Sequence, residues 1–396
     1  MKKDLLKIAD GISTLTIFSG LKSDPVVSAF SRLFEESDLR HRLDSYSTAV
    51  NRLFEKNEDL AKYLFDAVSQ DENIFVRRMA LGLPVSENMQ NSIDNELKIL
   101  QQLSLVTPSD IAEFLGYDGF LPEYSSSELD FPALYADRID HIGTHGYGIF
   151  AGHNIFTLNE GALIPVRHPD EITLSRLIGY RKQRQTVVDN TVALLEGRHA
   201  LNLLLYGDAG TGKSSTVKAI ANEFQDKGLR LIELKKSQLR DIPAVVETIG
   251  KNPLKFIIFI DDLSFNENDD DFAALKAALE GSVSALSENT VIYATSNRRH
   301  LIKEDIESRS GSELHENDTI QELVSLSERF GLTVSFMKPN KQEYTEIVLG
   351  LAKLHGLSVP EDRLILEAER FALRHAGRSA RTAKQFIDYA ISVDMK

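Results

Sequence analysis

The chain has 396 residues, of which 42% are hydrophobic and 26% are charged, as in a globular protein of about two to three domains. Its 59 acidic residues outnumber its 45 basic residues, and the net charge of -14 argues against a dedicated nucleic-acid coat or a membrane-surface binder. The chain has no cysteine, which excludes disulfides, thiol nucleophiles, Cys-ligated zinc and iron–sulfur clusters and fits a reducing compartment.

No apolar stretch of the sequence is long enough to span a membrane. The longest apolar runs, such as Phe256–Ile260, are strand-sized, whereas a spanning helix needs about 20 residues. The start, Met1-Lys2-Lys3, is similar to a signal peptide, but Asp4, Lys7 and Asp10 interrupt any apolar stretch behind it. We therefore expect a cytoplasmic protein with no membrane partner.

Residues 1–130 form a predicted helical N-terminal domain. Apolar residues recur at helical spacing, as in Leu60, Tyr63, Leu64, Ala67 and Val68. A capping Thr107 followed by Pro108 then begins a short helix. This region contains no catalytic constellation, so we expect it to serve for packing or for binding a partner. Residues 117–134 are rich in glycine, proline and serine, and they indicate a loop and a domain boundary.

Residues 131–170 are predicted to form a β-hairpin connector. Two strands, Tyr147–Leu158 and Ala162–Val166, flank the turn signal Asn159-Glu160-Gly161. Three histidines lie here at intervals typical of metal ligands, namely His141, His145 and His153. Because glycines between them exclude the helix that would align the rings, ordinary loop histidines are favoured over a metal site.

Residues 171–338 alternate between strands and helices, which indicates a parallel α/β sheet. The predicted strands are Leu203–Tyr206, Leu229–Leu234, Phe256–Ile260, Val291–Thr295 and Thr333–Phe336, with helices over Val217–Phe224 and Ile242–Ile249. After Pro339 three further apolar stripes predict a C-terminal helical domain over 339–396. The acidic run Asn266–Asp271 is predicted to be a solvated loop.

A phosphate-binding loop (P-loop, or Walker A motif) follows the first of these strands. The sequence from Gly207 to Ser214 matches G-x-x-x-x-G-K-[ST] between an apolar strand and an amphipathic helix. The predicted nucleotide-binding residues are Gly207, Asp208, Ala209, Gly210, Thr211, Gly212, Lys213, Ser214 and Ser215. The glycines allow backbone N–H groups to surround a phosphate, Lys213 would bridge the β- and γ-phosphates of ATP, and Ser214 would bind Mg²⁺.

Polar residues end the two strands that follow. Asp261 and Asp262 come directly after Phe256–Ile260, at 48 residues beyond Lys213, as the Walker B carboxylates of a P-loop enzyme would. We expect Asp261 to hold Mg²⁺ and Asp262 to polarise the attacking water. Asn297 ends the next strand and would orient that water or touch the γ-phosphate.

These motifs, in this order, resemble those of AAA+ ATPases over residues 171–396. The segments Asp261–Phe265, Tyr293–His300 and Ser325–Gly331 are more narrowly similar to a group of bacterial AAA+ proteins catalogued as a domain of unknown function. The resemblance implies an α/β, three-layer P-loop core over 171–338 and a helical lid over 339–396. Asp262 departs from the glutamate that is commoner in the superfamily, and its carboxylate is one methylene shorter.

The resemblance also implies further site residues. Arg329 matches the arginine finger that reaches the γ-phosphate of a neighbouring subunit, and it implies a homo-oligomeric ring. Arg381, with Arg378 as the second choice, matches the lid arginine that senses the nucleotide. Ile178-Gly179-Tyr180 matches the segment that lines the adenine pocket. The cofactors implied are ATP and Mg²⁺.

Several functions remain open. The first hypothesis is an ATP-driven machine acting on an unidentified protein client, and the second is a slowly hydrolysing, nucleotide-gated adaptor or loader similar to replication initiators. A small-molecule P-loop kinase is disfavoured because it would leave Arg329 and the helical C-terminus unexplained. A GTPase is disfavoured because Asn340-Lys341-Gln342-Glu343 fails the N-K-x-D guanine motif. Nucleic-acid binding is not excluded, although Arg298-Arg299-His300 and Lys235-Lys236 are only small basic clusters.

Overall fold

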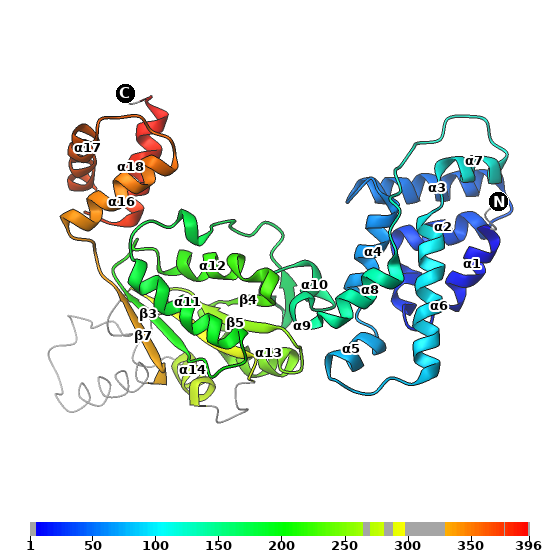
Figure 1. The fold of residues 1–396 in the computed structure, drawn as a ribbon, viewed down its shortest axis with the longest axis horizontal. Coiled ribbons are helices and arrows are strands. Elements are labelled where there is room, and N and C mark those ends of the chain that lie inside the picture. Colours follow the sequence, from blue (N-terminus) through cyan, green and yellow to red (C-terminus); the bar gives the residue numbers. More distant parts are fainter. Residues whose placement is uncertain (1–4, 264–269, 281–287, 298–328, 376, 395–396) are drawn as a thin grey trace. The chain divides into compact units, whose positions relative to one another are not determined.

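The computed structural model describes residues 5–263, 270–280, 288–297, 329–375 and 377–394 (Figure 1). It divides into two compact units, a first unit over Met1–Gly152 and a second unit over His153–Lys396. The predicted boundary lies at residue 130, so residues 131–152 of the expected connector fall within the first unit. Part of the predicted acidic loop, residues 266–269, lies outside the described residues, whereas the next two aspartates begin a helix.

The first unit is helical, as predicted. Its helices are α1 (Leu5–Thr14), η1 (Ser19–Ser23), α2 (Pro25–Glu35), α3 (Leu39–Phe54), α4 (Leu60–Gln70), α5 (Ile74–Ala80), α6 (Glu87–Ser104), α7 (Pro108–Leu115), α8 (Phe131–Asp140), α9 (Ile142–His145) and α10 (Ile149–Gly152). Short polar side chains cap the first turns of α2 to α8, and Thr107 and Asp110 form a reciprocal capping box at α7. These caps fix where those helices begin.

A single apolar core holds the first unit together, and it includes fully buried Phe18, Phe30 and Phe34. One carboxylate lies inside this core. Glu96 on α6 is 5% exposed, and its two oxygens accept backbone N–H bonds of 2.9–3.0 Å from Thr16, Ile17 and Phe18. The side chain therefore supplies the acceptors that the turn after α1 lacks.

The second unit contains a seven-stranded sheet. Its strands are β1 (Ile155–Asn159), β2 (Ala162–Pro165), β3 (Leu203–Gly207), β4 (Leu229–Leu234), β5 (Lys255–Ile260), β6 (Thr290–Ser296) and β7 (Leu332–Phe336), in the order β2-β1-β4-β5-β6-β3-β7. The β2–β1 pair is antiparallel and every other pair is parallel. All five strands predicted for the core are confirmed.

The prediction for the hairpin is corrected in two respects. The strand expected from Tyr147 begins only at Ile155, because Gly148 takes a φ of 60° and the residues after it form α10. The hairpin is also no separate connector, since β1 pairs in parallel with β4 and so extends the main sheet at one edge.

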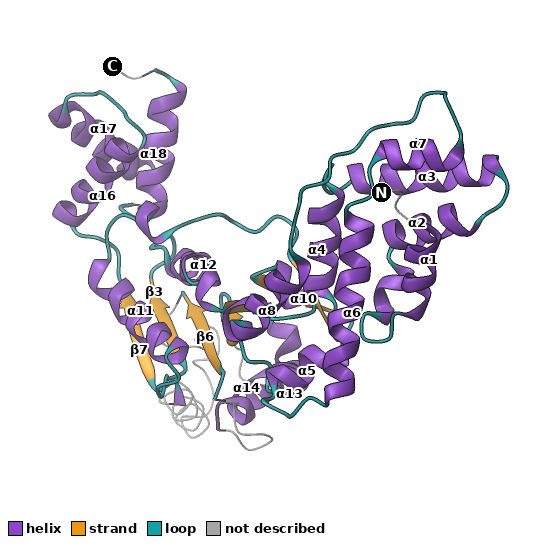
Figure 2. Cartoon of the chain, turned by 45° about the vertical axis from the view of Figure 1, so that its right-hand side comes forward, coloured by secondary structure: helices purple, strands orange, loops and turns teal. Residues whose placement is uncertain are grey.

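Helices enclose the sheet and follow it. They are η2 (Leu174–Arg176), α11 (Arg181–Leu195), α12 (Lys213–Glu223), η3 (Gln225–Lys227), η4 (Lys236–Asp241), α13 (Ile242–Ile249), α14 (Asp270–Glu280), α16 (Lys341–Leu354), α17 (Glu361–Arg374) and α18 (Ala380–Ser392). Every residue of β6 is buried, as in a sheet covered on both faces. Helices α11 and α12 pack on the face that carries Phe259 and Tyr293 (Figure 2). Helices α16–α18 share a smaller apolar core and form the predicted lid.

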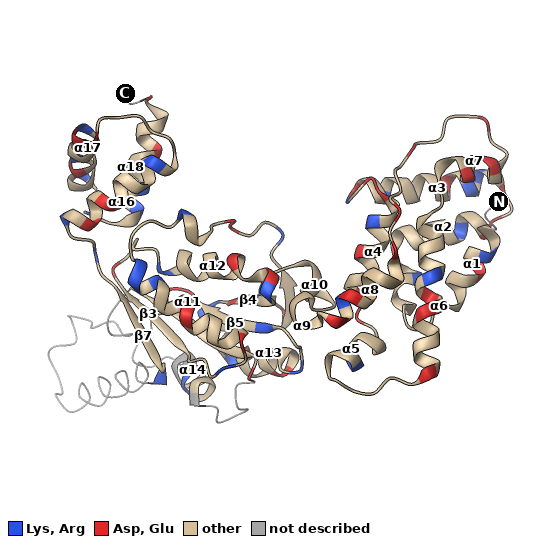
Figure 3. Ribbon diagram, viewed as in Figure 1, with Lys and Arg blue, Asp and Glu red and all other residues tan. Residues whose placement is uncertain are grey.

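The described residues form neither a membrane-spanning helix nor a histidine–carboxylate metal cluster. None of the helices in this part of the chain is both long and apolar enough to cross a membrane. No group of three or more histidine and carboxylate side chains in it is placed to hold a metal ion. His141 directly precedes α9 and His145 ends it, and His141 Nδ1 donates to the backbone carbonyl of Asp137 at 2.9 Å. Acidic and basic residues are interspersed along the helices of both units (Figure 3).

Candidate nucleotide-binding site

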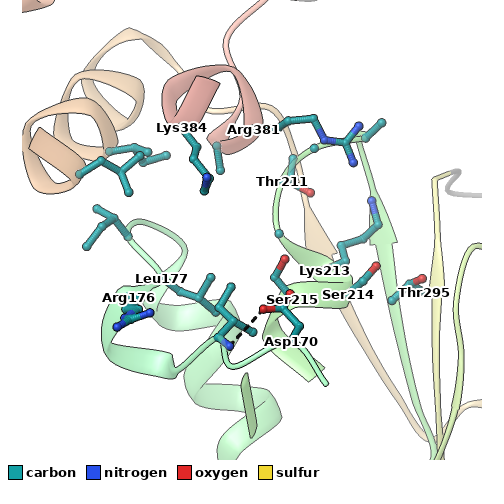
Figure 4. A pocket seen from close by; sticks show the side chains of 18 of the residues that line it. Asp170, Arg176, Leu177, Thr211, Lys213, Ser214, Ser215, Thr295, Arg381 and Lys384 are labelled. Atoms are coloured by element: carbon teal, nitrogen blue, oxygen red, sulfur yellow. Dashed lines mark hydrogen bonds between the residues drawn. The ribbon is translucent and has the colours of Figure 1, made fainter. Parts of the chain in front are cut away.

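A cavity of about 1110 Å³ lies in the second unit, where the parallel strands end (Figure 4). Its lining comprises residues 170–172, 176–178 and 209–215, with Asp261, Asp262, Thr295, Asn297, Ile347, Leu351, Leu354, His355, Ala380, Arg381 and Lys384. The carboxyl ends of β3, β5 and β6 meet here because parallel neighbouring strands end at the same edge. The topology thus gathers side chains that are far apart in the sequence.

The P-loop connects the end of β3 to the start of α12. Gly210 and Gly212 have φ angles of 76° and 94°, which L side chains rarely adopt. A Cβ on Gly212 would meet no atom within 4 Å, so the backbone there borders open space. The first amides of α12 have no partners within the helix, and the helix dipole favours an anion beside them. The loop can therefore accept a phosphate group.

Lys213 lies at the base of the loop and is 6% exposed. Its ammonium donates to Gly207 O at 3.0 Å, to Asp208 O at 2.7 Å and to Asn297 Oδ1 at 3.0 Å. Burial lowers the pKa of Lys213, and the nearby carboxylates, Asp208 first among them, act against that shift. The cation is held in one position at the point where the negative charge of a phosphate would be stabilised.

Asp261 lies beside the hydroxyl of Ser214. Its Oδ1 accepts from Ser214 Oγ at 2.6 Å, from Thr295 Oγ1 at 2.5 Å and from the backbone N–H of Asp262 at 3.1 Å. No hydrogen bond from the described part of the chain reaches Asp261 Oδ2. A carboxylate and a hydroxyl oxygen that both line the cavity are the donors that Mg²⁺ prefers. These residues fit the ion that the sequence implies.

Asp262 occupies an unusual backbone conformation, with a φ of 53°. The left-handed region costs a non-glycine residue roughly 1–2 kcal/mol, although aspartate tolerates it better than most residues do. Asn297 Nδ2 donates to Asp262 Oδ1 at 2.6 Å, while Asn297 Oδ1 accepts from Lys213. Asn297 therefore links the second carboxylate to the P-loop lysine.

The lid contributes α18 to the cavity. The backbone N–H of Arg381 donates to Gly210 O at 2.9 Å, and a Cβ on Gly210 would lie 3.0 Å from Arg381 Cβ. Figure 4 shows Arg381 and Lys384 across the cavity from Ser214. Arg378 does not line the cavity, since its guanidinium is paired with Glu369 at 2.8 Å. Of the two arginines considered from the sequence, Arg381 is the one at the site.

The segment predicted for the adenine pocket reaches the cavity only in part. Ile178 lines it, but Gly179 packs against Ile347, and Tyr180 donates to Met337 O at 2.7 Å. Gly179 and Tyr180 themselves do not line the cavity, and their part in an adenine pocket stays a prediction.

Sequence reasoning missed several lining residues. Leu177, Leu351, Leu354 and His355 border the apolar end, and Lys384 and Thr295 lie elsewhere in the lining. The sequence shows that α16 has an apolar stripe, but it does not show which residues of this stripe line the cavity. Asp170–Ile172 was missed as well, and Asn222 Nδ2 holds this segment by donating to Asp170 O at 2.7 Å and Ile172 O at 2.9 Å.

Arg329 lies away from the cavity of its own chain. It precedes β7, whose first residue Leu332 pairs with Leu203, whereas the P-loop glycine Gly207 pairs with Phe336 at the other end. Strand β7 has five residues, and at ~3.3 Å per residue its amino-terminal end lies about 15 Å from its carboxyl-terminal end beside the P-loop. Residues 298–328, which include the basic cluster Arg298-Arg299-His300, lie outside the described residues.

The fold and the site together define the class of protein. The P-loop strand β3 lies between β6 and β7, the acidic strand β5 is one strand further away, and a helical lid closes on the P-loop. This is an AAA+ P-loop protein with a nucleotide-binding fold. The chain belongs to the family described as "Protein of unknown function (DUF815)", whose model matches residues 152–393.

Other similarities are narrower. ORC1-type DNA replication protein 14 of Haloarcula marismortui is 44% identical over 59 residues, which are 15% of this chain and 14% of that protein. The RuvB Holliday junction branch migration motor of Thermotoga maritima is 17% identical, with a TM-score of 0.37 over 56% of this chain and 66% of that chain. A variant of the same protein gives 17% identity and a TM-score of 0.38 over the same shares.

Proposed function

We propose that the chain binds ATP with Mg²⁺, hydrolyses it, and uses the lid to transmit the change to a macromolecular client. The observation that carries the proposal is the convergence of P-loop, carboxylates, Asn297 and lid arginine on one cavity of about 1110 Å³. A nucleotide needs an anion-binding end and an apolar end, and this cavity has both. Its glycine-rich loop would receive the phosphates, and residues such as Leu177 and Leu351 would contact the base.

Ser214 and Asp261 would hold the metal ion. When bound, Mg²⁺ would neutralise part of the phosphate charge. Lys213 would add a fixed positive charge on the same side, exchanging one of its present acceptors for phosphate oxygens. Asp262 would accept a proton from the attacking water or polarise it, and the amide of Asn297 keeps this carboxylate aimed at the cavity.

The lid connection supports coupling of the nucleotide to movement. Gly210 of the P-loop accepts a hydrogen bond from the backbone N–H of Arg381. Because of this bond, a phosphate that shifts the backbone of the loop would also shift the first turn of α18. The guanidinium of Arg381 would add a direct contact to the phosphates. The position of the lid would then depend on whether ATP or ADP is bound.

Assembly into a homo-oligomer is part of the same proposal. Since Arg329 lies at the edge of the sheet opposite the P-loop, it can serve a nucleotide only in another copy of the chain. An arginine so placed would stabilise the developing charge on the γ-phosphate of its neighbour. A ring would give every site one such neighbour.

Isothermal titration and phosphate release test the proposal. Wild type should bind ATP with Mg²⁺, whereas Lys213→Ala should lose detectable binding because the charge at the phosphates is removed. Lys218→Ala is a matched control, since Lys218 lies on the same helix and pairs with Glu233 at 3.3 Å. Asp262→Asn should bind ATP and hydrolyse it ~10²–10⁴-fold more slowly. Unchanged affinity in Lys213→Ala, or unchanged turnover in Asp262→Asn, would contradict these assignments.

A second function, a nucleotide-gated loader on DNA, is favoured by one comparison. The partly similar relative is named a DNA replication protein, and its 59 matched residues are 44% identical to this chain. A loader would hydrolyse ATP slowly alone and faster with DNA, whereas DNA would not change the rate of ATP hydrolysis by a machine that acts on proteins. Turnover measured with and without duplex DNA separates the two.

A further inference from the structure

We infer that Thr295 is a positioning residue, which sets the orientation of the metal-binding carboxylate Asp261 and fixes the turn that presents Asp262. The inference rests on the proposed function, because it concerns the Mg²⁺ site of the same cavity. Thr295 is 1% exposed, and its hydroxyl makes one hydrogen bond with each of the two aspartates.

The sheet register places Thr295 beside Asp261. Strands β5 and β6 are parallel, and their last aligned pair is Ile260 with Ala294, so the next residues along each strand are these two. Side chains alternate between faces, and Tyr293 belongs to the cluster on the α12 face. Thr295 therefore points to the same face as Tyr293, where Ser214 at the start of α12 also meets Asp261.

The two oxygens of Asp261 are in different situations. Oδ1 accepts from Thr295 Oγ1 at 2.5 Å, from Ser214 Oγ at 2.6 Å and from Asp262 N at 3.1 Å. This exceeds the two lone pairs of one carboxylate oxygen. Among the described residues nothing bonds to Oδ2, so the hydroxyl of Thr295 fixes which oxygen remains available to a cation.

The same threonine holds the turn after the strand. Its hydroxyl accepts from the N–H of Asp262 at 2.9 Å, and its carbonyl accepts from the N–H of Leu263 at 2.7 Å. The first of these bonds holds Asp262 at a φ of 53°, a conformation that the chain would otherwise avoid. One residue thus controls both carboxylates.

The experiment separates the metal-dependent from the metal-independent part of nucleotide binding. A non-hydrolysable ATP analogue is titrated into Thr295→Val at increasing MgCl₂ concentrations and also in EDTA. Valine keeps the shape and removes the hydroxyl. We expect the half-maximal MgCl₂ concentration to rise about 10–100-fold, the usual effect of losing a residue that orients a metal ligand. Affinity in EDTA should stay within about twofold, since Lys213 and the P-loop are unchanged.

Two variants control for packing. Thr295→Ser keeps the hydroxyl and should restore the wild-type MgCl₂ dependence. Thr290→Val makes the same change at the other end of β6, where the hydroxyl bonds to Asn289, and should leave that dependence unchanged. The inference is overturned if Thr295→Val keeps the wild-type MgCl₂ dependence. It is also overturned if the affinity of this variant for the analogue falls as much in EDTA as it does with MgCl₂. A wild-type protein that binds no analogue overturns the proposed function instead.

Discussion

Two carboxylates, the buried Glu96 in the first unit and the half-buried Asp261 in the second, show how the same chemical group can complete a fold or remain available for a ligand. Glu96 in the first unit uses both of its oxygens for the backbone amides of one turn. Asp261 in the second unit accepts three hydrogen bonds at Oδ1 alone. In the described chain Asp261 Oδ2 has no donor, and it belongs to a residue that lines a cavity. Completeness of hydrogen bonding therefore separates the structural group from the candidate ligand.

The first unit contains a second example of the completed kind. Asp59 accepts at Oδ1 from the backbone N–H groups of Lys62 and Ser127, and at Oδ2 from the hydroxyl of Ser127. Burial by itself raises the pKa of Asp59, but these hydrogen bonds outweigh it and the pKa lies below its ordinary value. The carboxylate fixes the 117–130 loop to α4, and nothing in this arrangement calls for a ligand.

The largest predicted effect is on the rate of ATP hydrolysis, and it depends on whether a second copy of the chain completes the site that contains Asp261. If the nucleotide site is completed by Arg329 of a neighbour, Arg329→Ala should fold, bind ATP and hydrolyse it ~10³–10⁵-fold more slowly. Specific activity of wild type should also rise with protein concentration. Mixing Arg329→Ala with Lys213→Ala should partly restore turnover, because some interfaces join an intact arginine to an intact P-loop. Activity independent of concentration, with no rescue in the mixture, would describe a monomeric enzyme.

A smaller effect is expected from the completed carboxylate. Glu96→Gln replaces one acceptor oxygen by an NH₂ group that faces backbone N–H donors, which should lower the free energy of unfolding by about 2 kcal/mol. ATP turnover per folded molecule should not change. Asp94→Asn is the control, because Asp94 is exposed on the same helix and accepts from Gln90. Chemical denaturation followed by circular dichroism measures the difference, and a Glu96→Gln protein as stable as this control would remove the basis of the comparison.

Much of the second unit could be predicted from local sequence. A strand, a glycine-rich loop and a helix are encoded within residues 203–224, and parallel topology brings Asp261 and Asn297 to one edge. The pairing of β1 with β4 could not be predicted, because nothing near Ile155 specifies a partner 76 residues away at Leu231. The contact of Thr295 with Asp261 could not be predicted either, because a threonine in an apolar strand is common and only the register of the sheet places it beside this carboxylate.

The smallest predicted effect concerns the two lid arginines, which repeat the contrast between a completed group and an available one. Arg381→Ala should weaken ATP binding about tenfold, because it removes a charge that lines the cavity. Arg378→Ala should leave ATP affinity unchanged, since that guanidinium is occupied by Glu369. Titration of both variants under the same conditions decides which arginine serves the nucleotide, and a larger loss in Arg378→Ala would reverse the assignment.

The pair of Arg378 and Glu369 should instead appear in the pH dependence of stability. The hydrogen bond from Arg378 is the main cause that lowers the pKa of Glu369 below its ordinary value. A lowered pKa stabilises the fold at neutral pH, and this contribution is lost as the pH falls below the ordinary value of about 4.3 toward the folded value. Because the two side chains are 38% and 17% exposed, the contribution should not exceed about 1 kcal/mol. Arg378→Ala should therefore be slightly less stable than wild type at pH 7, and the difference should shrink as the pH falls below about 4.3. A difference that persists at low pH would show that Arg378 stabilises the lid by packing and not by its charge.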